Sequence, residues 1–476
     1  MFKSKIFDVL QCFPKEDLKK FGEYLNSPLF NKRKVISDLF RSYKNFHPEF
    51  DDKNLTKEKI FAKIFPGKKF NDENFRNLNS ILLKYAEEYL AYTNYSRDPL
   101  TIKKHLLSEI SHRKILTVFE KNFEEGNRML ESTGQRDLNY FFNEYELFLN
   151  KDIYNSMKSK FLKEDIMKAE KSLVIFFVMK ILEIENYILY GSRILNMDKS
   201  LYLKNTFSDD LMKNIPEEIK ELPQIRIYYN ALKLEQTDNI KYYNALKKLI
   251  GKYGNLINKE KHYNKYLEMI DFIKRTRGTK DMKSVSEIFQ LRKEIIEKNL
   301  LMENTITNMF FLNIVKSGSR LKEFEWIKNF ISEYQLLLIP KYRDITTELS
   351  LALFHFEKKE FNESLSHAAQ VKYEDNFYNL EVKNLTTKIY YETGNIESLV
   401  SFISSYRMYL SKNRSLNKKD LTSHNTFLNY LDKLIRIKEN KKFHKLDDLQ
   451  DVVSKASFVS DYWMLEQCAM SNDNQQ

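Results

Sequence analysis

Glycine and proline are scarce along this chain, which has 10 glycines and 8 prolines among 476 residues. Folds rich in β-sheet need many tight turns, and glycine, proline and Asn-Gly pairs supply most of them. Asn-Gly never occurs, and no proline follows Pro340. An interior proline removes a helix hydrogen bond and clashes with the preceding turn, so its absence leaves room for long helices. The scarcity of both residues predicts an all-α protein.

The composition is that of a folded chain, with 42% hydrophobic and 14% aromatic residues. Chains that stay disordered contain few such residues. Lysine and arginine outnumber aspartate and glutamate by 78 to 66, a net charge of +12, but the excess is spread along the sequence. A spread excess is typical of a solvated surface, whereas a nucleic-acid footprint concentrates its charge. The two cysteines, Cys12 and Cys468, lie far apart, so we expect neither a disulfide framework nor a structural zinc site.

Membrane segments are not expected. The most apolar run, Leu173–Met179, is much shorter than the roughly 20 residues that a membrane span needs. Near the N-terminus, Lys5 and Asp8 interrupt the apolar residues, which a signal peptide would not allow. A cytoplasmic location is therefore the expectation.

Helix signals divide the sequence into four regions: a helical block over residues 1–97, a middle helical region over 98–222, a repeat region over 223–470 and a disordered tail over 471–476. In the first region, Thr56 and Asn71 stand where their side chains can cap helices. In the middle region, apolar spacing predicts long helices at about 100–132, 137–156 and 157–190, followed by an irregular segment at 191–222.

After Pro223 the apolar spacing becomes periodic. Helical hairpins are predicted at 224–236 with 239–257, 259–275 with 282–300, 303–316 with 322–338, 342–358 with 361–371, 377–392 with 396–411, and 418–438 with 442–457. Successive hairpins begin roughly 35 to 45 residues apart, a period that marks helical solenoids. Each hairpin leaves one apolar face that the next hairpin covers. We therefore expect a helical-hairpin solenoid behind the N-terminal block.

The segment Ile345–Asn376 resembles a tetratricopeptide repeat, in the residues Leu351, Ala352, His355 and Phe361. The following unit repeats this frame 35 residues later, with Thr387, Tyr390, Gly394 and Ile396. Two features depart from the family: the small residue of the second helix is Ser364 in one unit but Leu399 in the next, and both units lack the closing proline. The resemblance implies a tetratricopeptide-like solenoid whose first helices face the inside of the superhelix.

The N-terminal block carries the segments Asn26–Asn31, Leu55–Glu58 and Phe65–Gly67. In these it resembles helical bacterial proteins of unknown activity that have a repeat region behind such a block. Leu55–Leu90 also resembles the winged-helix domain of bacterial transcriptional activators, which would make 72–92 a recognition helix. The outward residues of this helix are nearly neutral in net charge, whereas DNA-binding helices need cations to contact phosphate. These outward residues are Glu73, Arg76, Asn77, Lys84, Glu87 and Glu88.

No nucleotide-binding, hydrolase or calcium-binding motif occurs, so we expect no enzyme and no cofactor. His105, Glu109 and His112 share one helix face. Apolar residues continue along the same side of the helix, which favours a row at the boundary between core and solvent over a metal site. Basic runs stand at predicted hairpin loops, where lysines keep a solenoid soluble: Lys32–Lys34, Lys274 with Arg275, Arg277 and Lys280, and Lys412 with Arg414, Lys418 and Lys419.

Together these observations predict a non-catalytic scaffold that binds a partner protein or peptide on the concave surface of the solenoid. By the repeat frame, the residues that line this surface are Leu353, Phe356, Glu357, Asn384, Lys388, Tyr391 and Glu392. The alternative is a nucleic-acid-binding or transcription-regulator-like protein that uses the N-terminal block or the basic loops.

Overall fold

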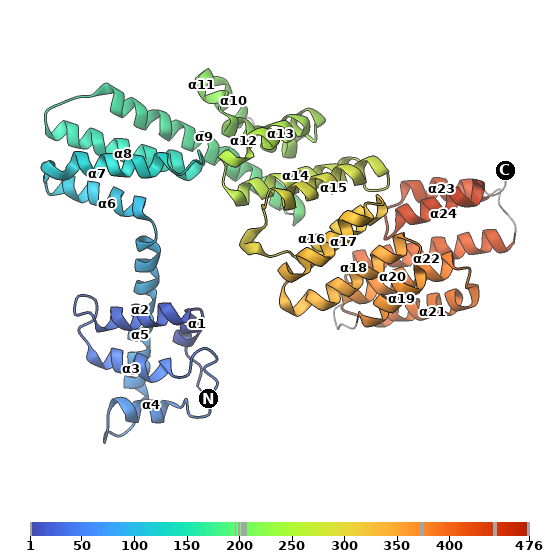
Figure 1. Ribbon diagram of the computed structural model, residues 1–476, viewed down its shortest axis with the longest axis horizontal. Helices are drawn as coiled ribbons and strands as arrows, with labels where there is room; N and C mark the ends of the chain where they lie inside the picture. The colour runs from blue at the N-terminus through green and yellow to red at the C-terminus, as the bar shows by residue number, and fades with distance from the viewer. Residues whose placement is uncertain are drawn as a thin grey trace. The chain divides into compact units, whose positions relative to one another are not determined.

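The chain is almost entirely helical in the computed structural model, which describes residues 2–195, 197–198, 200, 207–371, 376–440 and 445–473. Within these ranges it forms 24 α-helices and no strand, with one isolated β-bridge between Ile306 and Leu338 (Figure 1). The all-α prediction is confirmed. In the same ranges, none of the helices combines the length and apolarity that a membrane crossing demands. The chain divides into unit 1, residues 1–133 and 142–173, and unit 2, residues 134–141 and 174–476.

Five helices begin unit 1: α1 (Lys5–Gln11), α2 (Lys15–Asn26), α3 (Lys34–Lys44), α4 (Lys57–Ile64) and α5 (Asp72–Ser96). They enclose one hydrophobic core that runs from Ile6 to Tyr89 in sequence and is rich in aromatic rings. Thr56 and Asn71 cap α4 and α5 as predicted, because their side-chain oxygens accept the backbone N–H of Lys59 and Asn74 at 3.3 and 2.8 Å. Among the described residues of this block there is no strand that could form a wing.

The middle of the chain contains α6 (Pro99–His112), α7 (Phe119–Glu131), α8 (Leu138–Met157) and α9 (Lys163–Ile194). A single helix over 100–132 was expected, and this prediction is wrong. Lys114 adopts a left-handed conformation with φ of 56°, and the backbone N–H of Ile115 closes the end of α6 on the carbonyl of Ile110. The chain can then reverse, so that α6 and α7 pack against each other and bury their apolar sides.

The segment predicted as irregular, 191–222, contains the end of α9 and two short helices, α10 (Phe207–Asn214) and α11 (Glu217–Lys220). Its residues 196, 199 and 201–206 lie outside the described residues. The predicted tail is also partly helical, because the last helix continues to Asp473; residues 474–476 lie outside the described residues.

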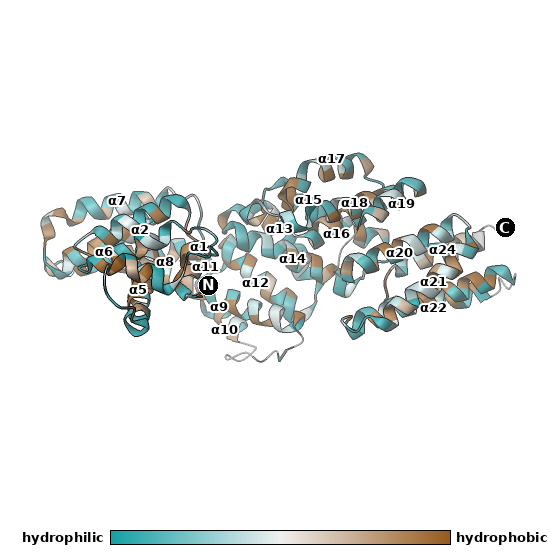
Figure 2. Cartoon of the chain, turned by 90° about the horizontal axis from the view of Figure 1, so that it is seen from below, coloured by the Kyte–Doolittle hydropathy of each residue, from teal (hydrophilic) through white to brown (hydrophobic). Residues whose placement is uncertain are grey.

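Unit 2 continues with helices that occupy the predicted hairpin ranges, and with one more at the C-terminal end. They are α12 (Pro223–Thr237), α13 (Ile240–Tyr253), α14 (Lys259–Thr276), α15 (Met282–Glu297), α16 (Asn308–Arg320), α17 (Phe324–Tyr334), α18 (Arg343–Glu357), α19 (Phe361–Gln370), α20 (Asn376–Glu392), α21 (Ile396–Lys412), α22 (Lys418–Glu439), α23 (Leu446–Lys455) and α24 (Asp461–Asp473). From α12 to α24, each helix packs against the next one in the chain, and α16, α18 and α20 also contact one another in that order. Figure 2 shows that these helices carry both hydrophobic and hydrophilic residues, as amphipathic helices do.

Three successive hairpins of unit 2 reverse direction through the same backbone turn. Lys322, Lys359 and Gly394 stand just after α16, α18 and α20, and all three have a left-handed φ of 62°, 66° and 70°. At each turn the next backbone N–H reaches a carbonyl five residues earlier: Glu323 to Gly318, Glu360 to His355 and Asn395 to Tyr390. This bond is the mark of the Schellman motif, which satisfies the carbonyls left free at a helix end.

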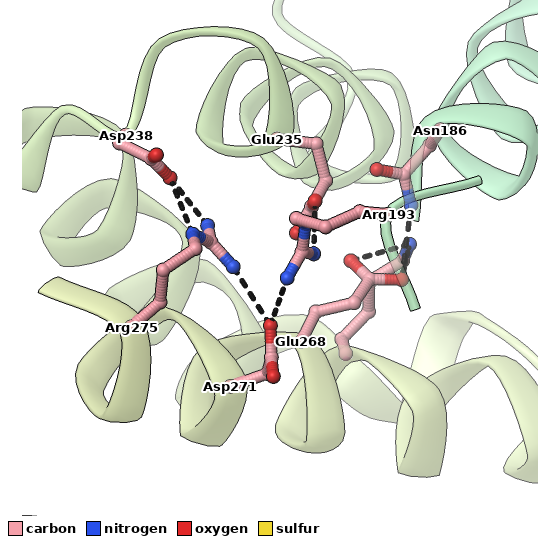
Figure 3. A network of polar contacts seen from close by, with 8 residues as sticks. Asn186, Arg193, Glu235, Asp238, Glu268, Asp271 and Arg275 are labelled. Carbon is pink, nitrogen blue, oxygen red and sulfur yellow. Dashed lines mark hydrogen bonds and ion pairs between the residues drawn. The ribbon is translucent and has the colours of Figure 1, made fainter. Parts of the chain in front are cut away.

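A network of ion pairs ties the second half of α9 to α12 and α14 within unit 2 (Figure 3). The Arg193 guanidinium donates to Glu235 and Asp271, and Asn186 donates to Glu268 at 2.9 Å. Burial raises the pKa of Glu235, although the Arg193 charge opposes this. A buried carboxylate in such a network stays ionised only because its cation is held beside it.

The pair of helix glycines Gly318 and Gly251 allows a test of this packing. A Cβ on Gly318 would lie 2.4 Å from Ile327 Cδ1 and 2.7 Å from Phe289 Cε2, whereas nothing lies within 4 Å of one on Gly251. We expect Gly318→Ala to lower the free energy of unfolding by about 1–3 kcal/mol through overpacking. Gly251→Ala should raise it by about 0.5–1 kcal/mol, because alanine favours the helix. Urea unfolding measures both, and equal effects of the two substitutions would contradict the packing of α16.

Candidate partner-binding face

The structure brings the predicted surface residues together on two neighbouring helices. Leu353, Phe356 and Glu357 lie on α18, and Asn384, Lys388, Tyr391 and Glu392 lie on α20. The Lys388 ammonium is 4.5 Å from the centre of the Phe356 ring, so the two sets are in contact. The predicted residues of α18 and α20 therefore meet at this contact.

These residues do not line an open groove. Leu353, Phe356, Asn384, Lys388 and Tyr391 are all buried, and Lys388 is 5% exposed. The residues that cover them belong to the same chain, in the segment 459–467 at the start of α24. We call the residues of α16, α18, α20 and α22 that contact this segment the covered face: Arg320, Glu357, Asn384, Tyr391, Glu392 and Phe427.

Trp463 is the aromatic anchor of α24 on the covered face. Its ring centre lies 5.4 Å from that of Tyr391 and 6.1 Å from that of Phe427, and the side chain is 2% exposed. The indole N–H donates to the Glu392 carboxylate at 2.8 Å. A buried indole needs such an acceptor, because an unpaired N–H would lose its hydrogen bond to water.

Polar contacts place the rest of the segment. The Ser460 hydroxyl donates to the Asn384 side-chain oxygen at 3.1 Å. The Arg320 guanidinium lies 4.0 Å from the centre of the Tyr462 ring and 3.7 Å from the Glu466 carboxylate. Cation–π and ionic contacts of this kind fix the orientation of a helix on a surface more than they add stability.

Beneath the segment, a cavity of about 100 Å³ is bordered by four charged side chains, Lys316, Glu357, Glu381 and Lys388. Burial lowers the pKa of Lys388 and raises that of Glu357, while the charge of each partner opposes these shifts. Burial also raises the pKa of Glu381, but Lys316, 2.7 Å away, outweighs this and holds it below its usual range. Two acids and two bases give the cavity no net charge when all four are ionised.

The arrangement can hold polar groups. Over the described residues, no three His, Cys, Asp or Glu side chains are placed to hold one metal ion. The row of His105, Glu109 and His112 lies on α6, where Glu109 pairs with Arg113, the residue that follows the helix.

Helix α24 was not among the predicted helices. Its apolar residues Trp463, Met464 and Cys468 are all buried, but they span little more than one helical turn, which is too short for spacing alone to indicate a helix. The available signal was Trp463 itself, one of only two tryptophans in the chain, since a tryptophan is large and mostly buried.

One predicted basic loop is engaged in ion pairs within the chain. Arg275 pairs with Asp238 and Asp271, and Arg277 pairs with Glu287. The Lys280 ammonium donates to the backbone carbonyls of Val453, Ser454 and Ala456 at the end of α23. These cations stabilise the fold, and a phosphate backbone would have to compete for them.

Glu357 gives the covered face a pH dependence that can be measured. Because burial raises its folded pKa above the unfolded value, ionised Glu357 destabilises the folded state at neutral pH. Glu357→Gln should therefore be more stable than the wild type at pH 7. The difference should shrink as the pH falls through the folded pKa, where the wild-type carboxyl takes up a proton. Urea unfolding from pH 7 to 4 measures this, with the exposed Glu363→Gln as control for the lost charge. A constant difference would show that Glu357 is not desolvated.

Comparison with known proteins leaves this geometry without a relative: no family model, no curated protein and no solved structure matches the chain.

Proposed function

We propose that unit 2 is a tetratricopeptide-like solenoid that acts as a non-catalytic scaffold and binds a partner peptide or domain on the covered face. The repeated turn at Lys322, Lys359 and Gly394 supports the solenoid, because it gives three hairpins the same reversal roughly one repeat apart. The packing of α16, α18 and α20 in chain order supports it further. In solenoids, neighbouring repeats supply the contacts that a single hairpin lacks.

The observation that carries the proposal is the way α24 lies on the covered face. A helix is held there by Trp463 against Tyr391 and Phe427, with Arg320 beside Tyr462. Aromatic and arginine side chains in desolvated surroundings are the residues that dominate binding energy in protein interfaces. This face accordingly has the chemistry to bind a helix, whether that helix belongs to the chain or to a partner.

Nucleic-acid binding, the second function that the sequence suggested, has no comparable support. Arg275 and Arg277 of the central basic loop are paired with carboxylates. The outward side of α5 includes Arg76 paired with Asp72, and Lys84 near Glu88. Neither surface offers a row of free cations, which phosphate recognition requires.

Site-specific photo-crosslinking in the full chain tests the scaffold function. Lys359 is half exposed at the edge of the covered face, where its ammonium lies 2.6 Å from Glu392, whereas Lys248 is exposed on α13. We expect a crosslinking amino acid at position 359 to form an adduct with a protein in an extract of the native host. The same amino acid at position 248 should form none. Identical adducts at both positions, or none at either, would contradict binding at this face.

A further inference from the structure

The covered face carries more polar groups than α24 satisfies. Four charged side chains border the cavity, and the covering segment offers Glu357 only the Tyr462 hydroxyl, at a long 3.4 Å. The Lys388 ammonium reaches no closer than 6.0 Å to the centre of the Tyr462 ring. Lys316 and Glu381 pair with each other, whereas Glu357 and Lys388 receive only long contacts from the segment, so packing α24 alone would be better served by apolar residues at these two positions. These four side chains fit an occupant that offers them more hydrogen bonds than α24 does.

The ionic contacts of α24 are long. Asp461 lies 3.7 Å from the Lys280 ammonium, and Glu466 lies 3.7 Å from the Arg320 guanidinium. Ion pairs at this distance contribute little to stability. What holds the helix is therefore mainly the burial of Trp463, Met464 and Cys468, which another helix of similar shape could replace.

The end of α23 has an anchor besides its packing against the covering helix. Lys280 donates to the carbonyls of Val453, Ser454 and Ala456, and these bonds do not depend on the position of α24. The short connection that follows includes Ser460, whose left-handed φ of 57° marks a bend at the start of α24. A connection of this kind can absorb the change in direction when a terminal helix swings away.

From these contacts we infer that α24 is an intramolecular competitor, and that the partner bound by the covered face is an acidic helix with two adjacent aromatic residues. This inference rests on the proposed function and names its partner class. Lys280 beside the covered face and Arg320 on it lie near acidic groups before and after the aromatic pair, which favours an acidic partner. Tyr391 and Phe427 receive the aromatic rings, and Glu392 accepts an indole N–H.

Cys468 offers a built-in reporter of displacement. It is fully buried on α24, and burial raises the pKa of its thiol to about 11, so it should resist alkylation while α24 is in place. The other cysteine, Cys12, is exposed and can be removed by Cys12→Ser. The probe is a fluorescent peptide with the sequence of residues 457–473 in which serine replaces Cys468.

In the Cys12→Ser chain, we expect a saturating concentration of this peptide to accelerate alkylation of Cys468 by about tenfold or more. A peptide with alanine in place of Tyr462 and Trp463 should leave the rate unchanged. In a chain that also carries Trp463→Ala, the competitor is weakened, so the wild-type peptide should bind about tenfold more tightly or more. The matched control is Met470→Ala, an exposed position of the same helix, which should not change binding.

The inference would be overturned if the peptide bound neither chain and left the alkylation rate of Cys468 unchanged. If the Trp463→Ala chain does not fold, the same result in the Cys12→Ser chain alone overturns it. A concentration-dependent dimer with protected Cys468 would also overturn it, because α24 of a second copy would then be the occupant. Host adducts at position 359 that the peptide does not compete away would leave the scaffold function standing and reject this partner class. If the peptide binds but no host protein forms an adduct at position 359, the scaffold function is rejected. The ability of the covered face to bind such a helix would still stand.

Discussion

The reversal of the chain after each first helix is the constraint on which unit 2 depends. One left-handed residue ends α16, α18 and α20, and the same N–H to carbonyl bond closes each helix end. Lysine takes this conformation at two of the three turns, at positions where glycine would adopt it at lower cost. Because the turn is the same, the first helices follow one another along one side, and close approaches such as that of Gly318 to Ile327 become possible.

The covered face is a product of this arrangement and of α24 together. The first helices contribute a floor of charged and aromatic side chains, and α24 contributes Tyr462, Trp463 and Glu466 from far along the chain. Burial raises the pKa of Glu357 and lowers that of Lys388, and Tyr462 of α24 borders the same cavity.

Much of the helical structure could be predicted from the sequence, because amphipathic spacing and capping residues act locally. The helices α12 to α23 and the caps at Thr56 and Asn71 belong to this class. The break after α6 was missed because Lys114 is not a residue that ordinarily ends a helix. The burial of Lys388 was missed for a different reason, since a lysine on a helix reads as exposed until the segment that covers it is known. Its cover comes from α24, whose own sequence has too little periodicity to reveal it.

The order in which the chain is synthesised gives the covered face a consequence for biogenesis. Tyr462 contacts Glu357 across 105 residues, and Lys280 contacts the end of α23 across more than 170. On the ribosome, α16 to α22 emerge before the helix that closes over them, so Tyr391 and Phe427 are open to solvent during that interval. Contacts between distant segments form late, and transiently exposed apolar surface attracts chaperones or neighbouring nascent chains. The face that is hidden in the finished protein is therefore the one most available to other proteins while the chain is being made.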